Sequence, residues 1–210
     1  MRALDHVHAI FKIFDKENPH PKGDLTYSSP FELLIAVVLS AQATDISVNK
    51  ATDKLFKVAN TPESIYALGK EGLKVYIRHI GLYNSKAEHV VRLCKILMDE
   101  FDSKVPDDLD SLTSLPGVGR KTANVVLNIA FSQPTIAVDT HVFRVSKRMG
   151  LTAANTVLGV ELDLYRVVPK KYLMHAHLWF ILHGRYVCKA RSPLCNECSL
   201  TQYCQYYFEK

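Results

Sequence analysis

Four of the five cysteines stand close together near the end of the chain and could bind a metal. They are Cys188, Cys195, Cys198 and Cys204, which gives the spacing C-x6-C-x2-C-x5-C. Four thiolates in one short loop fit either a tetrahedral zinc ion or a [4Fe–4S] cluster, and the spacing does not choose between them. Zinc is the more general expectation for such a loop. The fifth cysteine, Cys94, lies in an apolar helical pattern, and we expect it in the core.

A second set of residues that could do chemistry surrounds Lys121. The stretch Leu115-Pro116-Gly117-Val118-Gly119-Arg120-Lys121 predicts a tight glycine turn that leads directly into a helix. The first turn of a helix has unpaired N–H groups and the positive end of the helix dipole, so glycines that allow close approach make a seat for a phosphate. Lys121 places a primary amine beside that seat, where positive neighbours favour the neutral, nucleophilic form. The stretch therefore predicts a phosphate contact with a candidate nucleophile next to it.

Asp139 is a candidate of a different kind. It follows three apolar residues and precedes a helix that we expect to run to Met149, where Gly150 stops it. Its simplest role is the N-cap of that helix. A carboxylate kept ionised by helix-start N–H groups could also accept a proton or stabilise a cation that develops at a sugar carbon. Both roles are open at this point.

Other side chains are weaker candidates for contacts to a nucleic acid. Gln42 can donate and accept hydrogen bonds at a base edge, although a polar helix end explains it more simply. Lys189 and Arg191 lie in the cysteine loop, where cations suit phosphate contacts or merely a solvated surface. Leu82 stands in a polar loop, and such a leucine usually packs against the fold.

These residues need helices to position them, and the apolar spacing is helical along the chain. Ser29, Pro30 and Glu32 predict a capping box that opens a buried helix through Leu39. In the first half of the chain, further helices are expected over residues 4–14, 48–58, 72–80 and 86–101, with one more starting at residue 61. In the second half, one helix is expected after Asp108 and others over residues 122–131, 140–149, 156–168 and 172–186. No strand-like alternation of useful length and no repeat is present, so the predicted fold class is all-α.

Composition places the protein in a broad class. The 210 residues are 48% hydrophobic, which suffices for a full core. Lys and Arg total 26 against 21 Asp and Glu, a moderate excess that favours a polyanionic partner without proving one. The start of the chain has no secretory signal, and the longest apolar run, residues 33–39, is too short to span a bilayer. We therefore expect the protein to be located in the reducing cytoplasm and not to associate with membranes.

Over nearly its whole length, the chain resembles the endonuclease III family, bacterial DNA glycosylases with apurinic/apyrimidinic lyase activity. The four-cysteine spacing carries part of the resemblance. The other stretches that carry it are residues 28–36, 39–45, 80–87, 115–126, 134–141 and 182–186.

The resemblance implies a helix-hairpin-helix DNA glycosylase fold, in which two helical domains flank a DNA-binding cleft. Residues 22–132 would form a six-helix barrel domain that includes the helix-hairpin-helix at about 108–131. Residues 1–21 and 133–210 would together form the domain that holds a [4Fe–4S] cluster.

The resemblance also implies roles for single residues. By position, Lys121 matches the catalytic lysine and Asp139 the catalytic aspartate. Gln42 and Leu82 match residues that fill or wedge the gap left by an extruded base. The four cysteines match the cluster ligands, which overrides the general expectation of zinc. Further DNA contacts are expected from Gly117, Gly119, Arg120, His141, Lys189 and Arg191.

The activity implied is that of a bifunctional DNA N-glycosylase and lyase of base excision repair. Such an enzyme excises oxidised pyrimidines from duplex DNA and cleaves 3′ to the abasic site by β-elimination through a lysine Schiff base. Its partner would be double-stranded DNA with a damaged pyrimidine or an abasic site, and it would act as a monomer in the bacterial cytoplasm, associated with the nucleoid.

Two alternatives are open. In a non-catalytic DNA-binding iron–sulfur protein, Lys121 would only contact phosphate. An adenine-mismatch glycosylase is the poorer alternative, because that class lacks a lysine at the position of Lys121. It also needs a carboxylate in the helix before Gln42, and residues 34–39 contain none.

Overall fold

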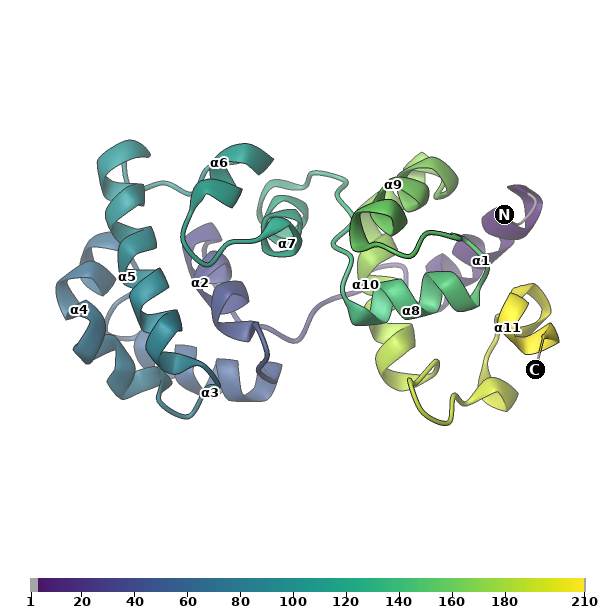
Figure 1. The fold of residues 1–210 in the computed structure, drawn as a ribbon, viewed down its shortest axis with the longest axis horizontal. Coiled ribbons are helices and arrows are strands. Elements are labelled where there is room, and N and C mark those ends of the chain that lie inside the picture. Colours follow the sequence, from purple (N-terminus) through teal and green to yellow (C-terminus); the bar gives the residue numbers. More distant parts are fainter. Residues whose placement is uncertain (1–3, 210) are drawn as a thin grey trace. The chain divides into compact units, whose positions relative to one another are not determined.

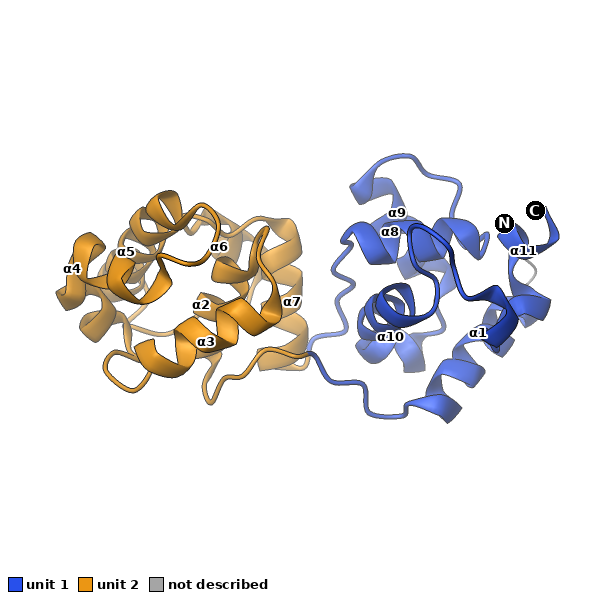
Figure 2. Cartoon of the chain, turned by 90° about the horizontal axis from the view of Figure 1, so that it is seen from below, with its two compact units in different colours: residues 1–23, 133–210 blue, residues 24–132 orange. Residues whose placement is uncertain are grey.

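The computed structural model describes residues 4–209, and the chain divides into two units (Figure 2). One unit is continuous and covers residues 24–132. The other is discontinuous and joins residues 1–23 to residues 133–210. Every regular element within residues 4–209 is a helix, which confirms the predicted all-α class.

The continuous unit contains six α-helices in chain order (Figure 1). They are α2 (Pro30–Ser40), α3 (Asp45–Leu55), α4 (Pro62–Ile77), α5 (Tyr83–Glu100), α6 (Leu109–Ser114) and α7 (Arg120–Phe131). Helix α4 packs on α5, and α2 packs on α7 and contacts α3 and α5. Helix α2 is the centre of the unit, since all residues from Phe31 to Leu39 are buried.

The start of α2 corrects one detail of the expected capping box. The Ser29 hydroxyl accepts a hydrogen bond from the Glu32 N–H at 3.2 Å, as predicted for an N-cap. The Glu32 carboxylate does not return to Ser29, however. It accepts from the backbone N–H and the hydroxyl of Ser28, at 2.6 and 2.7 Å. A serine one position earlier offers two donors instead of one, so the reciprocal bond moves there.

Helix α4 replaces the two helices expected over this part of the chain. It runs from Pro62 to Ile77 but is interrupted at Gly69, whose φ of 63° is not helical. The two helical segments therefore exist, but they follow each other across a kink and not across a loop. A capping box between Thr61 and Ser64 fixes the start.

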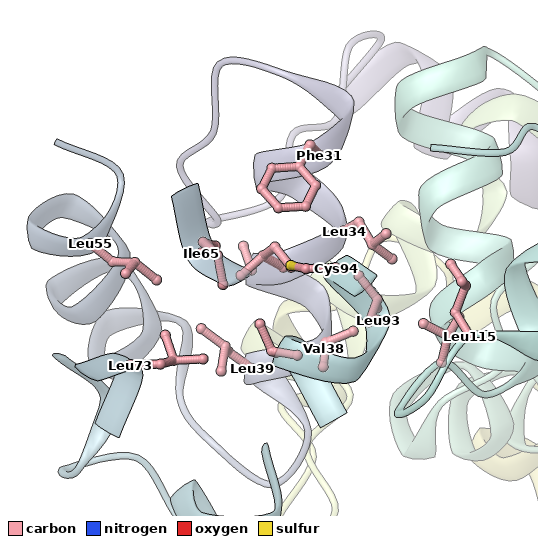
Figure 3. Packing of buried hydrophobic residues seen from close by; sticks show 14 of the residues in the cluster. Phe31, Leu34, Val38, Leu39, Leu55, Ile65, Leu73, Leu93, Cys94 and Leu115 are labelled. Carbon is pink, nitrogen blue, oxygen red and sulfur yellow. The ribbon is translucent and has the colours of Figure 1, made fainter. Parts of the chain in front are cut away.

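The core of this unit holds Cys94 as predicted. It belongs to the buried cluster that also contains Leu34, Val38 and Leu93 (Figure 3). Burial, with a smaller contribution from the Glu63 carboxylate, raises the pKa of the Cys94 thiol to about 12. Cys94 is therefore a packed, un-ionised side chain.

The discontinuous unit is built around aromatic side chains. Its elements are α1 (Leu4–Glu17), α8 (Thr140–Arg148), α9 (Val157–Val167), η1 (Lys170–Tyr172), α10 (Leu173–Tyr186), η2 (Cys195–Glu197), η3 (Thr201–Tyr203) and α11 (Gln205–Phe208). Phe11 and Phe14 of α1 pack against Trp179 and Phe180 of α10, with ring centroids 5.8 to 6.3 Å apart. The indole of Trp179 donates to the carbonyl of Asn18 at 2.7 Å. These contacts join the first helix to the second half of the chain.

None of the helices in residues 4–209 is both long and apolar enough to cross a membrane.

Candidate active site and cysteine pocket

The segment around Lys121 forms helix, turn and helix within the continuous unit. Helix α6 is capped by Asp108, whose carboxylate accepts from the Ser111 N–H at 2.9 Å. The turn closes with the Val118 N–H donating to the carbonyl of Leu115 at 3.1 Å. Helix α7 then begins at Arg120, two residues earlier than expected, with Gly119 as its N-cap residue. Lys121 is exposed in the first turn of this helix.

The two glycines of the turn have different reasons to be glycine. Gly117 has a φ of 80°, and a Cβ there would lie 3.1 Å from the Cβ of His89, so the fold itself requires glycine. Gly119 has an extended backbone with a φ of −90°, and a Cβ there would meet nothing within 4 Å. Nothing in the continuous unit requires glycine at position 119. The space at the position of its missing side chain is open within this unit.

Asp139 is the N-cap of α8 in the discontinuous unit. Its Oδ1 accepts hydrogen bonds from the N–H groups of His141 and Val142, both at 2.8 Å. No donor among residues 4–209 reaches the other oxygen, Oδ2, and the side chain is half-buried. The simple capping role is therefore confirmed, and one oxygen remains available.

His141 packs where α8 crosses α10. A Cβ on Gly184 would lie 3.0 Å from the Cβ and from the Nδ1 of His141, so only glycine lets the two helices approach this closely. The same Nδ1 is 3.2 Å from the Nη2 atom of Arg144. The half-buried ring of His141 thus has a packing role in addition to the predicted contact with DNA.

Gln42 and Leu82 lie on two loops that contact each other. Both residues are exposed and both have left-handed backbone, with φ of 54° and 61°, which costs about 1–2 kcal/mol for a residue other than glycine. The carbonyl of Gln42 is so close to Gly81 that a Cβ there would be 3.4 Å away. Leu82 is 57% exposed, so it is not a packed loop leucine.

Lys86, which we did not single out from the sequence, ties these loops to α2. Its ammonium donates to the carbonyl of Leu39 at 2.9 Å, and the residue is only 5% exposed. Burial lowers the pKa of Lys86. The signal was present in the sequence, because Lys86 stands on the same helical face as the buried Val90, Leu93 and Leu97.

The four cysteines of the tail line one pocket in the discontinuous unit. Cys188, Cys195, Cys198 and Cys204 lie there with apolar neighbours that include Met149 and Leu200. Burial raises the pKa of the Cys198 and Cys204 thiols, and the charges of the neighbouring cysteines raise both further. Four thiols along one mainly apolar pocket are the donor set of an iron–sulfur group and equally of a zinc ion.

Two arginines of α8 hold this loop, and sequence reasoning missed both. Arg144 donates to the carbonyls of Gly184 and Cys188, at 2.8 and 3.2 Å. Arg148 donates to the Cys188 sulfur at 3.4 Å and to the carbonyls of Lys189 and Ala190, at 2.7 and 3.0 Å. Backbone carbonyls have no sequence signature, so these partners could not be read from the sequence.

The remaining predicted contacts are exposed cations. Arg120 lies on the first turn of α7, and Lys189 and Arg191 lie on the loop between the first two cysteines. The structure brings the four cysteines together and places Gln42 beside the loop of Leu82. Lys121 and Asp139 belong to different units, and their pairing stays a prediction.

Comparison with known proteins defines the class. The model of the HhH-GPD superfamily base excision DNA repair proteins matches residues 35–170. The model of the iron-sulfur binding domain of endonuclease III matches residues 188–204, the segment of the four cysteines. The helical fold and the cysteine pocket are thus those of a base excision repair protein.

Relatives at high identity narrow this class. Endonuclease III of Rickettsia conorii is 58% identical over 202 residues, which cover 96% of this chain and 96% of that protein. Endonuclease III of Escherichia coli is 57% identical over 191 residues, covering 91% and 90%. The solved structure of a trapped endonuclease III–DNA covalent intermediate matches with a TM-score of 0.93 at 46% identity, covering 100% of this chain and 99% of that one. The chain belongs to the endonuclease III family.

This assignment confirms the resemblance seen in the sequence. The protein is a DNA glycosylase with abasic-site lyase activity in base excision repair, not a non-catalytic binding protein. Its cofactor is a [4Fe–4S] cluster, not zinc.

Proposed function

We propose that this enzyme excises oxidised or ring-saturated pyrimidines from duplex DNA, with Lys121 as the nucleophile. The observation that carries the proposal is an exposed primary amine in the first turn of α7, directly after the glycine turn. The turn binds the phosphate backbone of the damaged strand, and the amine then lies beside the sugar of the same strand.

The chemistry begins with extrusion of the damaged nucleotide, because its sugar carbon cannot be attacked within the base stack. The neutral amine of Lys121 attacks C1′, the C1′–N bond breaks, and the base leaves with the bonding electrons and takes up a proton. The ring-opened sugar and the lysine form a Schiff base. This makes a proton on C2′ acidic, and its removal expels the 3′ phosphate. The strand is then cut on the 3′ side of the lesion.

Asp139 supplies the negative charge that these reaction steps need. A positive charge develops on the sugar as the base leaves, and the amine must lose protons as it forms the new bond. The Oδ2 atom, which no described donor reaches, is the group we assign to both tasks. The bonds to Oδ1 hold the carboxylate in one orientation.

The other predicted residues bind DNA. Gly119 supports this assignment, because the space in front of it is open and lets a phosphate reach the helix start. Gly117 shapes the turn, and Arg120 contacts phosphate beside it. Gln42 and Leu82 occupy the gap left by the extruded nucleotide. In the discontinuous unit, His141, Lys189 and Arg191 contact the backbone.

The cluster has a structural role in this proposal. Through its four thiolate ligands, the cluster holds together the loop that carries Lys189 and Arg191. No step of the reaction passes through the cluster. Two solved relatives, described as a trapped endonuclease III–DNA covalent intermediate and a non-covalent endonuclease III–DNA complex, support DNA as the partner. We expect the enzyme to act as a monomer in the cytoplasm, associated with the nucleoid.

Borohydride trapping tests the nucleophile. Duplexes that each carry one defined lesion are incubated with the enzyme and reductant, and covalent protein–DNA adducts are counted. The wild type is trapped on thymine glycol and abasic duplexes, because reduction converts the Schiff base to a stable amine. Lys121→Gln still binds these duplexes but forms no adduct and cuts no strand.

The matched control is Lys104→Gln, which removes another exposed lysine of the continuous unit and should leave trapping unchanged. Strand cleavage that persists in Lys121→Gln would sink the assignment of the nucleophile. Equal trapping on undamaged and damaged duplexes would refute the proposed substrate class.

A further inference from the structure

Ile46 is an exposed apolar residue that the fold does not explain. It is the second residue of α3 and is 83% exposed, more than any other large hydrophobic side chain in residues 4–209. A β-branched apolar residue at this place improves neither helix formation nor solubility. A single exposed isoleucine is unremarkable by itself, so its surroundings decide whether it has a role.

Ile46 lies on the same pair of contacting loops as Gln42 and Leu82. The ring Nε2 of His79 is 3.2 Å from the carbonyl of Ser47, next to Ile46. A Cβ on Gly81, next to Leu82, would lie 3.4 Å from the carbonyl oxygen of Gln42. The two loops therefore come close at two points, and residues 42, 46 and 82 lie exposed on the surface of this loop pair.

Two hydrogen bonds anchor the backbone beneath this surface. The buried Lys86 joins the start of α5 to the end of α2 through the carbonyl of Leu39. Thr44 caps α3 by accepting from the Ser47 N–H at 3.2 Å. Apolar side chains on such a support keep their positions against a partner at little entropic cost.

Cations flank the apolar side chains. Lys50 is exposed one turn along α3, on the same helical face as Ile46. Arg78 is exposed on the other loop. An apolar centre with cations beside it is complementary to opened duplex DNA, in which apolar base faces lie between rows of phosphates.

We propose that Ile46 is a third DNA-contacting residue of this surface, which packs against the base stack beside the lesion and helps Gln42 and Leu82 to hold the duplex open. This inference rests on the proposed function. The apolar contact of Ile46 adds to the wedge of Leu82, while Gln42 offers hydrogen bonds to the base that has lost its partner.

The test measures binding to duplexes that carry a non-cleavable tetrahydrofuran abasic site, with 2-aminopurine next to the position opposite it. Fluorescence of 2-aminopurine rises when that base is unstacked. We expect Ile46→Ala to bind the lesion duplex about fivefold to tenfold more weakly and to give a smaller fluorescence rise. Binding to undamaged duplex, which depends on phosphate contacts, should be unchanged.

Val58→Ala is the matched control, since Val58 is 61% exposed just beyond the opposite end of α3. Ile46→Leu should restore most of the affinity, because it restores apolar area. If Ile46→Ala binds and unstacks DNA like the wild type, the inference is wrong, whether or not Leu82→Ala has an effect. The proposed chemistry is judged separately by borohydride trapping, which Ile46→Ala should still show when DNA saturates the enzyme.

Discussion

In the proposed reaction, Asp139 combines two duties in one carboxylate. Its Oδ1 caps α8 through two short hydrogen bonds, and its Oδ2 is the oxygen that we assign to the chemistry. Capping needs an acceptor at Oδ1 but no negative charge, whereas stabilising a cationic sugar needs the charge. The two duties can therefore be separated by one substitution.

Asp139→Asn should keep the fold and lose the reaction. The amide oxygen can accept both bonds of the cap, so the free energy of unfolding should change by less than about 0.5 kcal/mol. Base release in single-turnover experiments should fall about 100-fold or more, because the charge is gone. Asp108→Asn changes the N-cap of α6 in the same way and should leave the rate unchanged. Near-normal base release in Asp139→Asn would reduce Asp139 to a helix cap.

At the level of residues, local roles could be predicted and distant ones could not. Capping residues at 29 and 139 were expected, because a cap acts on the next three residues. The partners of Arg144 and Arg148 lie about forty residues away and are mostly carbonyl oxygens. The left-handed backbone at Gln42 and Leu82 was also missed, since neither is a residue type that favours it.

At the level of elements, the turn between α6 and α7 contains one glycine that the fold requires and one that we assign to DNA binding. The positive φ of Gly117 and the nearby His89 require glycine at position 117. Neither reason applies at position 119. Both glycines fit the same sequence motif, and only the structure distinguishes their reasons.

Alanine at the two positions should therefore give opposite results. Gly117→Ala should lower the free energy of unfolding by about 1–2 kcal/mol, because alanine is strained at a φ of 80° and meets His89. Gly119→Ala should change it by less than about 0.5 kcal/mol, since an extended backbone suits alanine but alanine is a poorer N-cap residue than glycine. The affinity of Gly119→Ala for DNA should nevertheless fall. Denaturant unfolding and DNA binding measure both effects, and full DNA affinity in a stable Gly119→Ala would show that no phosphate sits there.

The helices themselves were mostly predictable, and the exceptions have local causes. Helix α7 begins at Arg120 because Gly119 can serve as the N-cap residue, which the sequence did not distinguish from the turn. Helix α4 is interrupted at Gly69 because glycine permits a positive φ there. The second helical segment follows directly after this kink.

At the level of the whole molecule, each unit has its own core, and the cluster loop belongs to the discontinuous one. The single tryptophan of the chain, Trp179, lies in that same core. Its fluorescence therefore reports on the discontinuous unit, while the helical circular dichroism signal reports on both.

Removal of the cluster should destabilise only the discontinuous unit. We expect the fluorescence transition to move to lower denaturant concentration and the circular dichroism transition to split in two, because four thiolates lose the metal that binds them together. Cys94→Ala is the mirror-image control, since it leaves a cavity in the other core and should shift only the second transition. A single unchanged transition after cluster loss would contradict this account.

The contact between the first helix and α10 has a consequence for biosynthesis. Phe11 and Phe14 emerge from the ribosome more than 160 residues before Trp179 and Phe180. The continuous unit can fold in the meantime, because all its residues have been made by position 132. During this interval the apolar face of the first helix has no native partner. It is the segment of the nascent chain that a chaperone has the most reason to cover.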